Sequence, residues 1–384
     1  MTCRAPPLAL YVHMPWCVRK CPYCDFNSHP LKSDRPDAGY IDALIRDFES
    51  ELPLIGARAI ETVFFGGGTP SLFAPEQIAR LLEALRARAG FAQDAEITLE
   101  ANPGTIERGR FAGYRDAGVN RVSLGAQSFS GEALGVLGRI HTPDDTRRAV
   151  AELGEAGIDN FNLDLMYALP NQSVDGALAD VEAACALAPL HISHYQLTLE
   201  PGTAFHARPP ALPDEDAAYL MQTECQSLLA RRGYVQYEVS AYARAGALCR
   251  HNLNYWRFGD YVGIGAGAHG KVSLEMPERI VRTTKPLHPR EYLRRVEAGG
   301  APIGEREFIE DRQLPFEFML NALRLREGFG GADFEARTGL ELARAAPALA
   351  QAVRRGLLEM SADRWRPTEL GRRFLNDLMA GFLP

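Results

Sequence analysis

The chain has 384 residues, of which 46% are apolar and 24% are charged, a balance typical of a soluble globular protein. This length suits one large domain with a smaller one, or two domains of medium size. The formal net charge of -7 argues against binding through a bulk positive field, so we expect no nucleic acid among its partners.

Three further features concern the compartment. No apolar run approaches the length needed to cross a bilayer. The seven cysteines are odd in number and the chain is large, unlike a disulfide-stapled secreted domain. The N-terminal segment leads directly into a cysteine cluster, so we expect no cleaved signal peptide. The sequence therefore predicts a protein of the reducing cytoplasm.

Strand-like segments alternate with amphipathic segments over the first two-thirds of the chain. In chain order, the expected strands are Leu8–Met14, Glu61–Gly66, Glu96–Ala101, Arg121–Gln127, Phe161–Tyr167 and His191–Leu199. The expected helices are Asp37–Leu52, Pro75–Ala89, Ile106–Ala117, Pro143–Ala156, Val174–Ala186 and Asp214–Arg232. Such alternation is typical of βαβ units with a parallel sheet. It predicts an α/β fold, a full or partial β/α barrel with its site at the C-terminal ends of the strands.

The pattern becomes helical after about Arg282. We expect a barrel domain over residues 1–280 and a small, helix-rich C-terminal domain over residues 281–384, of a winged-helix-like type. Winged helices often bind DNA, but this segment has no basic recognition helix. Packing against the barrel is the simpler interpretation.

Three cysteines, Cys17, Cys21 and Cys24, follow the first expected strand with the spacing C-x3-C-x2-C. A structural zinc site takes four protein ligands, usually as two pairs, and no second pair follows. The nearby side chains that could complete a zinc site are His13, Asp25 and His29. A [4Fe-4S] cluster also takes four ligands, so three thiolates would leave one iron open to a small molecule.

This solitary motif after the first strand of a β/α fold resembles the signature of the radical S-adenosylmethionine (SAM) superfamily. The resemblance implies that the open iron binds the amino and carboxylate groups of SAM, while the protein positions the reactive cofactor. The glycine-rich "FFGGGTPS" (residues 64–71) resembles the motif that holds the amino group of SAM in that superfamily. Glycine lets the backbone approach a ligand closely.

Polar side chains also occur at the ends of apolar strands, namely Glu100, Gln127 and Asp164. A buried carboxylate is costly unless it is paired, so each residue alone is equally well explained as a satisfied core group. Several at successive strand ends fit a ligand with ribose hydroxyls and an amino-acid head. Arg139 supplies a cation that can pair with a carboxylate.

A closer resemblance covers nearly the whole chain. It rests on "YVHMPWCVRKCPYC", "FFGGGTPS", "LEANPG", "GVNRVSLGAQSF", "LGRIHT" and "FNLDLMYALPNQ", which resemble the oxygen-independent coproporphyrinogen III oxidase group. The resemblance implies that the cluster ligands are Cys17, Cys21 and Cys24. It implies that the SAM contacts are Tyr11, Tyr23, Gly68, Thr69, Glu100, Gln127, Arg139 and Asp164.

That group contains a decarboxylating dehydrogenase and a heme chaperone. The dehydrogenases have a longer segment before the cluster and a fourth cysteine two residues after the third. Here only sixteen residues precede Cys17, and Phe26 stands in place of the fourth cysteine. The sequence therefore favours the chaperone branch over the dehydrogenase.

"CRHNLNYW" (residues 249–256) resembles a motif of the chaperone branch, which implies heme contacts at His251, Tyr255 and Trp256. A neutral imidazole can bind heme iron, and aromatic rings can flank a porphyrin. Cys249 is a nearby alternative ligand. The simpler alternative is a histidine that only forms hydrogen bonds beside aromatic side chains of the core.

We therefore expect a heme chaperone with three cofactors, a [4Fe-4S] cluster, SAM and heme, and a heme-accepting apoprotein as partner. A homodimer and peripheral contact with a membrane-bound acceptor stay open. The main alternative is the dehydrogenase, and a further one is a radical enzyme that degrades heme. The acidic balance argues against a transcriptional regulator.

Overall fold

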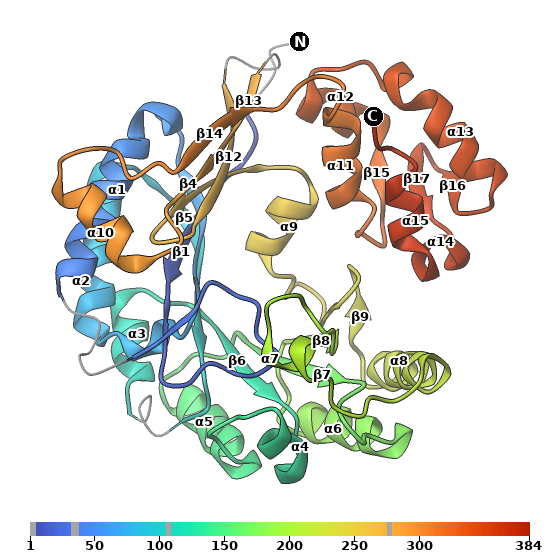
Figure 1. Cartoon of the computed structure of the whole chain (residues 1–384), viewed down its shortest axis with the longest axis horizontal. Helices are drawn as coiled ribbons and strands as arrows, with labels where there is room; N and C mark the ends of the chain where they lie inside the picture. Colours follow the sequence, from blue (N-terminus) through green and yellow to red (C-terminus); the bar gives the residue numbers. More distant parts are fainter. Residues whose placement is uncertain (1–4, 32–37, 105–108, 275–278) are drawn as a thin grey trace.

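The chain was analysed as a computed structural model, which describes residues 5–31, 38–104, 109–274 and 279–384. A 12-stranded sheet curves into an incomplete ring, with strand order β14-β13-β12-β11-β1-β4-β5-β6-β7-β8-β10-β9 (Figure 1). Within the described residues no ladder joins β9 to β14, so the barrel is partial. This confirms the predicted α/β fold.

The middle of the sheet is parallel, and both edges are antiparallel. The parallel strands are β11 (Asp260–Ile264), β1 (Leu8–Met14), β4 (Ile60–Gly67), β5 (Phe91–Ala101), β6 (Arg121–Gln127), β7 (Phe161–Tyr167) and β8 (His191–Gln196). The edge strands are β9 (Val235–Gln236), β10 (Ala241–Ala243), β12 (His269–Leu274), β13 (Arg279–Thr284) and β14 (Glu305–Phe308).

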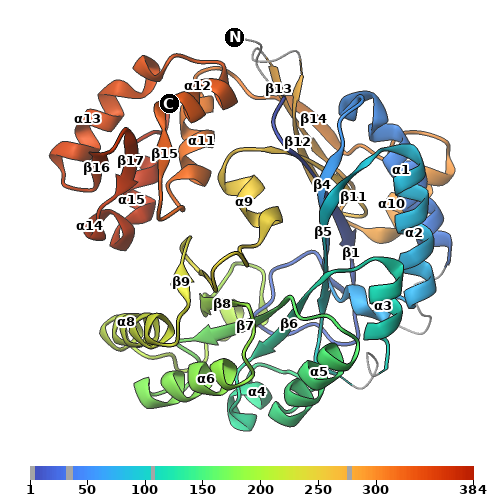
Figure 2. The ribbon, with the colours of Figure 1, turned by 180° about the vertical axis from the view of Figure 1, so that it is seen from behind.

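Helices cover the outer face of the curved sheet (Figures 1 and 2). They are α1 (Ala38–Ile55), α2 (Pro75–Arg88), α3 (Phe111–Ala117), α4 (Gly131–Val136), α5 (Pro143–Glu155), α6 (Val174–Ala186), α8 (Glu215–Arg231) and α10 (Pro289–Glu297). The short helix α7 (Ala204–Ala207) lies instead against the cysteine-bearing loop, where the Phe205 N–H donates to the Pro22 carbonyl. None of the helices that the structure describes combines the length and apolar character needed to cross a membrane.

Local sequence explains where these helices begin, as α5 illustrates. The Thr142 hydroxyl accepts a hydrogen bond from the Asp145 N–H, while the Asp145 carboxylate accepts one from the Thr142 N–H. Pro143 occupies the first turn, where its missing N–H costs nothing. Ala149 and Leu153 then face the core. Capping and amphipathicity together fix this helix against the sheet.

The six expected strands and six expected helices are all present where the chain is described. β1, β6, β7 and α6 have the expected bounds, whereas β5 begins five residues earlier than expected, at Phe91. The expected helix starts at Asp37 and Ile106 lie outside the described residues. The expected domain boundary at residue 280 falls inside β13, and the large sheet continues to Phe308.

The C-terminal region has its own core, centred on Phe318 and Phe334. Its helices are α11 (Leu314–Ala322), α12 (Gly331–Thr338), α13 (Ala346–Arg354), α14 (Glu369–Arg373) and α15 (Leu375–Ala380). Its antiparallel sheet has the order β15 (Phe329–Gly330), β17 (Arg364–Pro367) and β16 (Leu358–Ser361). Helices followed by a β hairpin give the winged-helix-like layout that we expected. Phe258 of the barrel region joins this core, so the two parts pack together.

Helix α9 (Arg250–Trp256) lies in the opening of the ring, between the parallel strands and α11 (Figure 1). The space that α9 borders is not an apolar core. The side chains around it include Glu100, Arg121, Asn162 and Asp164. Closed β/α barrels usually fill this space with branched apolar side chains. The polar interior of this barrel is therefore a feature to be explained by function.

Candidate functional site

The cysteine-bearing loop follows β1 and is fixed to the barrel at several points. Its short strands β2 (Trp16–Cys17) and β3 (His29–Pro30) pair in parallel. The Asn27 amide donates hydrogen bonds to the carbonyls of Ala266, at 2.9 Å, and Leu287, at 2.8 Å. These contacts tie the loop to segments more than two hundred residues away and give it a defined position over the barrel.

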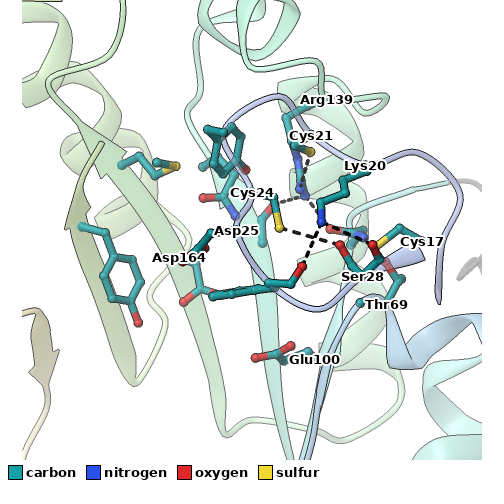
Figure 3. Close-up of a pocket in the computed structure, with 18 of the residues that line it drawn as sticks. Cys17, Lys20, Cys21, Cys24, Asp25, Ser28, Thr69, Glu100, Arg139 and Asp164 are labelled. Carbon is teal, nitrogen blue, oxygen red and sulfur yellow. Dashed lines mark hydrogen bonds between the residues drawn. The ribbon is translucent and has the colours of Figure 1, made fainter. Parts of the chain in front are cut away.

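All three cysteine thiols line one cavity of about 400 Å³ at the C-terminal ends of the strands (Figure 3). Each sulfur has a polar neighbour from the protein. The Thr69 hydroxyl donates to Cys17 Sγ at 3.5 Å, an Arg139 N–H donates to Cys21 Sγ at 3.7 Å, and Ser28 Oγ lies 3.9 Å from Cys24 Sγ. Such contacts favour thiolates, because they stabilise negative charge on sulfur.

The arrangement of the thiols distinguishes between the metal sites considered from the sequence. Among the described residues, no three His, Cys, Asp or Glu side chains come together as ligands of a single metal ion. Zinc–sulfur bonds of about 2.3 Å would bring sulfurs to about 3.8 Å from one another. In an iron–sulfur cluster each thiolate binds a different iron, so the sulfurs surround a larger space. Three thiols lining one cavity fit a [4Fe-4S] cluster better than zinc.

Burial raises the pKa of the Cys17 thiol, opposed by the hydrogen bond from Thr69. Burial likewise raises the pKa of the Cys24 thiol, opposed by hydrogen bonds at Phe26 and Ser28. Deprotonation of these thiols would therefore accompany binding of a positively charged iron–sulfur core, which takes thiolates as ligands.

The glycine-rich turn after β4 lies against the cysteine loop. The N–H of Gly68 donates to the Met14 carbonyl and that of Thr69 to the Trp16 carbonyl, both at 2.7 Å. Gly67 has a φ of 109°, a conformation that favours glycine. A Cβ at Gly68 would lie 2.5 Å from the Trp16 carbonyl oxygen, so only glycine permits this approach. The turn thereby sets the distance between the cysteine loop and β4.

Most of the expected SAM contacts line the same cavity as the cysteines. They are Tyr23, Gly68, Thr69, Glu100, Gln127, Arg139 and Asp164. Gln127 has a φ of 66°, which is uncommon for a residue with a side chain. Strained backbone of this kind clusters at binding sites, and here it accompanies an amide that lines the cavity.

Arg139 and Glu100 show how this cavity is charged. The Arg139 guanidinium donates to the Asn102 amide oxygen at 2.5 Å and to the Gly125 carbonyl at 2.7 Å, which holds its charge beside Cys21. Burial and the Asp164 carboxylate raise the pKa of Glu100 to about 8, despite a hydrogen bond from the Gly67 N–H. Glu100 is therefore mostly protonated at neutral pH in this structure and ionises readily beside a cation.

Tyr11 is not among the residues that line the cysteine cavity. Its hydroxyl lies 3.1 Å from His13 Nδ1, and its ring lines a second cavity of about 220 Å³. This lower cavity lies deeper in the barrel, against α9. The two cavities have four lining residues in common, Glu100, Ser123, Asp164 and Tyr195. Tyr11 therefore lines only the lower cavity, together with two other expected SAM contacts, Glu100 and Asp164, which line both cavities.

Two of the three expected heme contacts, His251 and Tyr255, also line the lower cavity. His251 is 1% exposed, and both of its ring nitrogens have partners. Nδ1 lies 2.8 Å from the Thr62 hydroxyl, and Nε2 lies 3.2 Å from the Tyr255 hydroxyl. Burial, with a smaller effect of the Arg121 cation, lowers the pKa of His251 to about 3. The imidazole is thus neutral, the form that binds iron, but both of its ring nitrogens are engaged in hydrogen bonds, one as donor and the other as acceptor.

Trp256 lies apart from the other two expected heme contacts and lines neither cavity. Its ring faces the Arg324 guanidinium at 4.3 Å, and it packs with a cluster that includes Leu253 and Leu325. The structure therefore brings Trp256 to the junction with the C-terminal region.

Some residues of this site were not singled out from the sequence. In the cavity lined by the cysteines, called the upper cavity from here on, the Asn102 amide donates to the Thr69 hydroxyl and Ser28 contacts Cys24. Ser123 and Tyr195 belong to the wall that the two cavities share. Asn102 and Ser123 occur within the quoted motifs, and alternation along their strands could have identified both. Nothing in the sequence marks Tyr195, which lies beyond those motifs.

Comparison with known proteins agrees with this geometry. Residues 11–184 match the model of the Radical SAM superfamily, and residues 309–374 match the HemN C-terminal domain. In overall structure, the chain is similar to coproporphyrinogen III oxidase (HemN) from Escherichia coli, with a TM-score of 0.83 and 22% identity over 98% of this chain and 90% of that one. The arrangement of fold and cysteines defines a radical SAM protein.

Closer relatives narrow this class. The chain is 49% identical to heme chaperone HemW of Escherichia coli strain K12, over 99% of both chains. It is 47% identical to heme chaperone HemW of Haemophilus influenzae, again over 99% of both chains. Over 79% of this chain and 71% of the other, it is 38% identical to the mitochondrial radical S-adenosyl methionine domain-containing protein 1 of Bos taurus. The chain belongs to the HemW family.

Proposed function

We propose that this protein is a heme chaperone, which binds heme and a SAM-ligated [4Fe-4S] cluster and delivers the heme to an acceptor protein. The observation that carries the proposal is its 49% identity to a heme chaperone over 99% of both chains. The cavity with three thiols supports the cluster. Because these thiols are free in the structure and must stay reduced to bind iron, we also propose a cytoplasmic location.

The cluster would be held by Cys17, Cys21 and Cys24. The one iron without a cysteine ligand would bind the amino and carboxylate groups of SAM. Such a cluster supplies an electron that can cleave SAM. The protein's own part is positioning. The backbone at Gly68 and Thr69 would face the amino group, and Arg139 and Gln127 would orient polar groups of the ligand. Asp164 is suited to accept hydrogen bonds from ribose hydroxyls.

The main alternative is oxygen-independent coproporphyrinogen III dehydrogenase. The structural likeness to HemN favours it, but at 22% identity that likeness concerns the fold alone. Phe26 argues against it, since it stands where those enzymes have a fourth cysteine. Its side chain is 60% exposed at the rim of the upper cavity. An exposed aromatic ring suits contact with a porphyrin or a partner better than metal binding.

A paired assay tests the choice between these functions. Protein with an anaerobically reconstituted cluster is first titrated with heme, and we expect a saturable shift of the Soret band. The same protein is then incubated with coproporphyrinogen III, SAM and a reductant, and we expect no protoporphyrinogen IX. Formation of protoporphyrinogen IX would refute the chaperone proposal, and so would the absence of saturable heme binding.

The hydrogen bonds of His251 give a sharper test of the heme ligand. To bind iron through Nε2, His251 must lose its contact with the Tyr255 hydroxyl. His251→Ala should therefore weaken heme binding and change the Soret maximum. Tyr255→Phe, the matched control, removes only the competing hydroxyl and should leave heme affinity equal or higher. If His251→Ala binds heme like the wild type, the axial ligand lies elsewhere.

A further inference from the structure

Arg121, the first residue of β6, has a position that neither the cluster nor SAM explains. Its side chain is 2% exposed and lines the lower cavity inside the barrel. Its Nε has no hydrogen-bond partner. Within the described part of the chain, no hydrogen bond or ion pair involves its guanidinium. A buried cation without a partner is costly, so such a group is expected to have a ligand.

The nearest acidic groups do not fill this role. Glu96 and Asp164 affect Arg121 electrostatically but form no ion pair with it. The Glu96 carboxylate accepts hydrogen bonds from the Arg250 and His251 N–H groups, at 3.1 and 3.0 Å. Asp164 accepts hydrogen bonds from the Ser123 hydroxyl, at 3.1 Å, and the Asn162 amide, at 2.9 Å. Both carboxylates are thus occupied by other donors.

Arg121 keeps its charge in this environment. Burial acts to lower its pKa, but Cys249, Glu96, Tyr237 and Asp164 act in the opposite direction and the net effect is a raised pKa. Besides Arg121, the cavity is lined by two carboxyl residues, Asp164 and Glu100, and burial raises the pKa of Glu100 to about 8. The neutral hydrogen-bonding side chains around it are Tyr11, Ser123, Asn162, Ser193, Tyr195, His251, Asn252 and Tyr255. A cavity of about 220 Å³ has room for several water molecules or a short organic group.

We propose that the lower cavity is a binding site for a carboxylate group, which Arg121 pairs with through two parallel N–H···O hydrogen bonds. A planar carboxylate matches the guanidinium fork, and its single negative charge balances the single positive charge of Arg121. A phosphate dianion would fit less well, because Glu96 and Asp164 already contribute negative charge nearby. The site goes beyond heme carriage, since it needs neither iron nor a porphyrin.

The carboxylate can come from two sources: a free short-chain acid, or a carboxylate arm of a tetrapyrrole. The shared wall of Glu100, Ser123, Asp164 and Tyr195 would bring either one next to the contents of the upper cavity. The binding chemistry at Arg121 is the same in both cases.

Thermal unfolding of the full chain in sodium propionate, against sodium chloride of equal ionic strength and pH, tests the free-acid source. We expect a saturable rise in Tm for the wild type and for Arg355→Met, a control at the exposed arginine that directly follows α13. Arg121→Met should lose the rise. Arg121→Lys, which keeps the charge but not the fork, should weaken propionate binding about tenfold to a hundredfold.

Heme and heme dimethyl ester test the tetrapyrrole source in the same proteins. If heme binds more tightly than its ester in the wild type and the two bind equally in Arg121→Met, the carboxylate belongs to the tetrapyrrole. Either this result or the propionate result supports the site. The proposal is overturned if propionate gives no specific rise in Tm and the preference for heme over its ester is absent or unchanged in Arg121→Met. The propionate test remains valid even if the protein does not carry heme.

Discussion

Replacement of Gly68 by alanine should disrupt the upper cavity through a single methyl group. A Cβ at this position would lie 2.5 Å from the Trp16 carbonyl oxygen and 2.8 Å from that of Met14. Both atoms belong to backbone that leads directly into Cys17, and neither can rotate away as a side chain would. The glycine turn and the cysteine loop must therefore move apart.

The size of the effect follows from this geometry. Relief of the closest contact to ordinary van der Waals distance needs a movement of about 0.9 Å. Overpacking of this kind costs about 1–3 kcal/mol. If the whole cost falls on the assembled site, affinity for SAM should decrease by roughly fivefold to a hundredfold. The hydrogen bonds at Gly68 and Thr69, both 2.7 Å, should weaken in parallel.

The measurement is SAM titration by calorimetry on anaerobically reconstituted protein, with iron content and Tm recorded for each variant. Gly135→Ala is the matched control, because a Cβ there meets nothing within 4 Å and the residue lies inside α4. This control should bind SAM normally and be slightly more stable. Equal SAM affinity and equal Tm in Gly68→Ala and the wild type would refute the steric argument.

Three other results should follow. Cys21→Ala should bind at most a fraction of the wild-type iron after reconstitution, by iron analysis and absorbance near 400 nm, and full iron content would contradict the assignment. Lys285→Met removes the only positive partner that the described structure gives to the buried carboxylates Asp47 and Glu51. The substitution should lower the free energy of unfolding, measured in urea, by about 3–5 kcal/mol. A loss below about 1 kcal/mol would contradict this expectation and show that the site relaxes. Because the folded-state pKa of Glu100 is raised to about 8, its contribution to stability is greatest at low pH and is lost as pH rises through 8. Glu100→Gln should therefore gain about 2.7 kcal/mol of unfolding free energy relative to wild type between pH 6 and pH 9, and parallel stability curves would disprove it.

The parallel part of the fold could be predicted because each strand is a short apolar run between amphipathic helices. Leu8–Met14 and Phe161–Tyr167 needed no tertiary information. The antiparallel edges could not be predicted in the same way. Residues 241–243 form a strand of three residues whose pairing depends on a distant neighbour, and β13 continued the sheet where the composition suggested a new domain.

The site shows a similar division. The spacing of Cys17, Cys21 and Cys24 predicted a shared location, and all three line one cavity. Position along a strand could not show that Tyr11 lines only the lower cavity while Glu100 lines both, because depth within the barrel depends on strand stagger. The sequence of α9 placed His251 and Trp256 near one another, but a helix directs residues five positions apart to different sides. Arg121 could not be identified from the sequence, because only the structure shows that its buried Nε has no hydrogen-bond partner.

The wall shared by the two cavities makes their contents thermodynamically interdependent. A ligand in the upper cavity that orders or charges Glu100 and Asp164 alters the surface that a ligand in the lower cavity meets. By reciprocity, the factor by which the first ligand changes the affinity of the second equals the factor by which the second changes that of the first. In such a protein, occupancy of one cavity can change how tightly the other cavity holds its ligand, without any large movement of the chain.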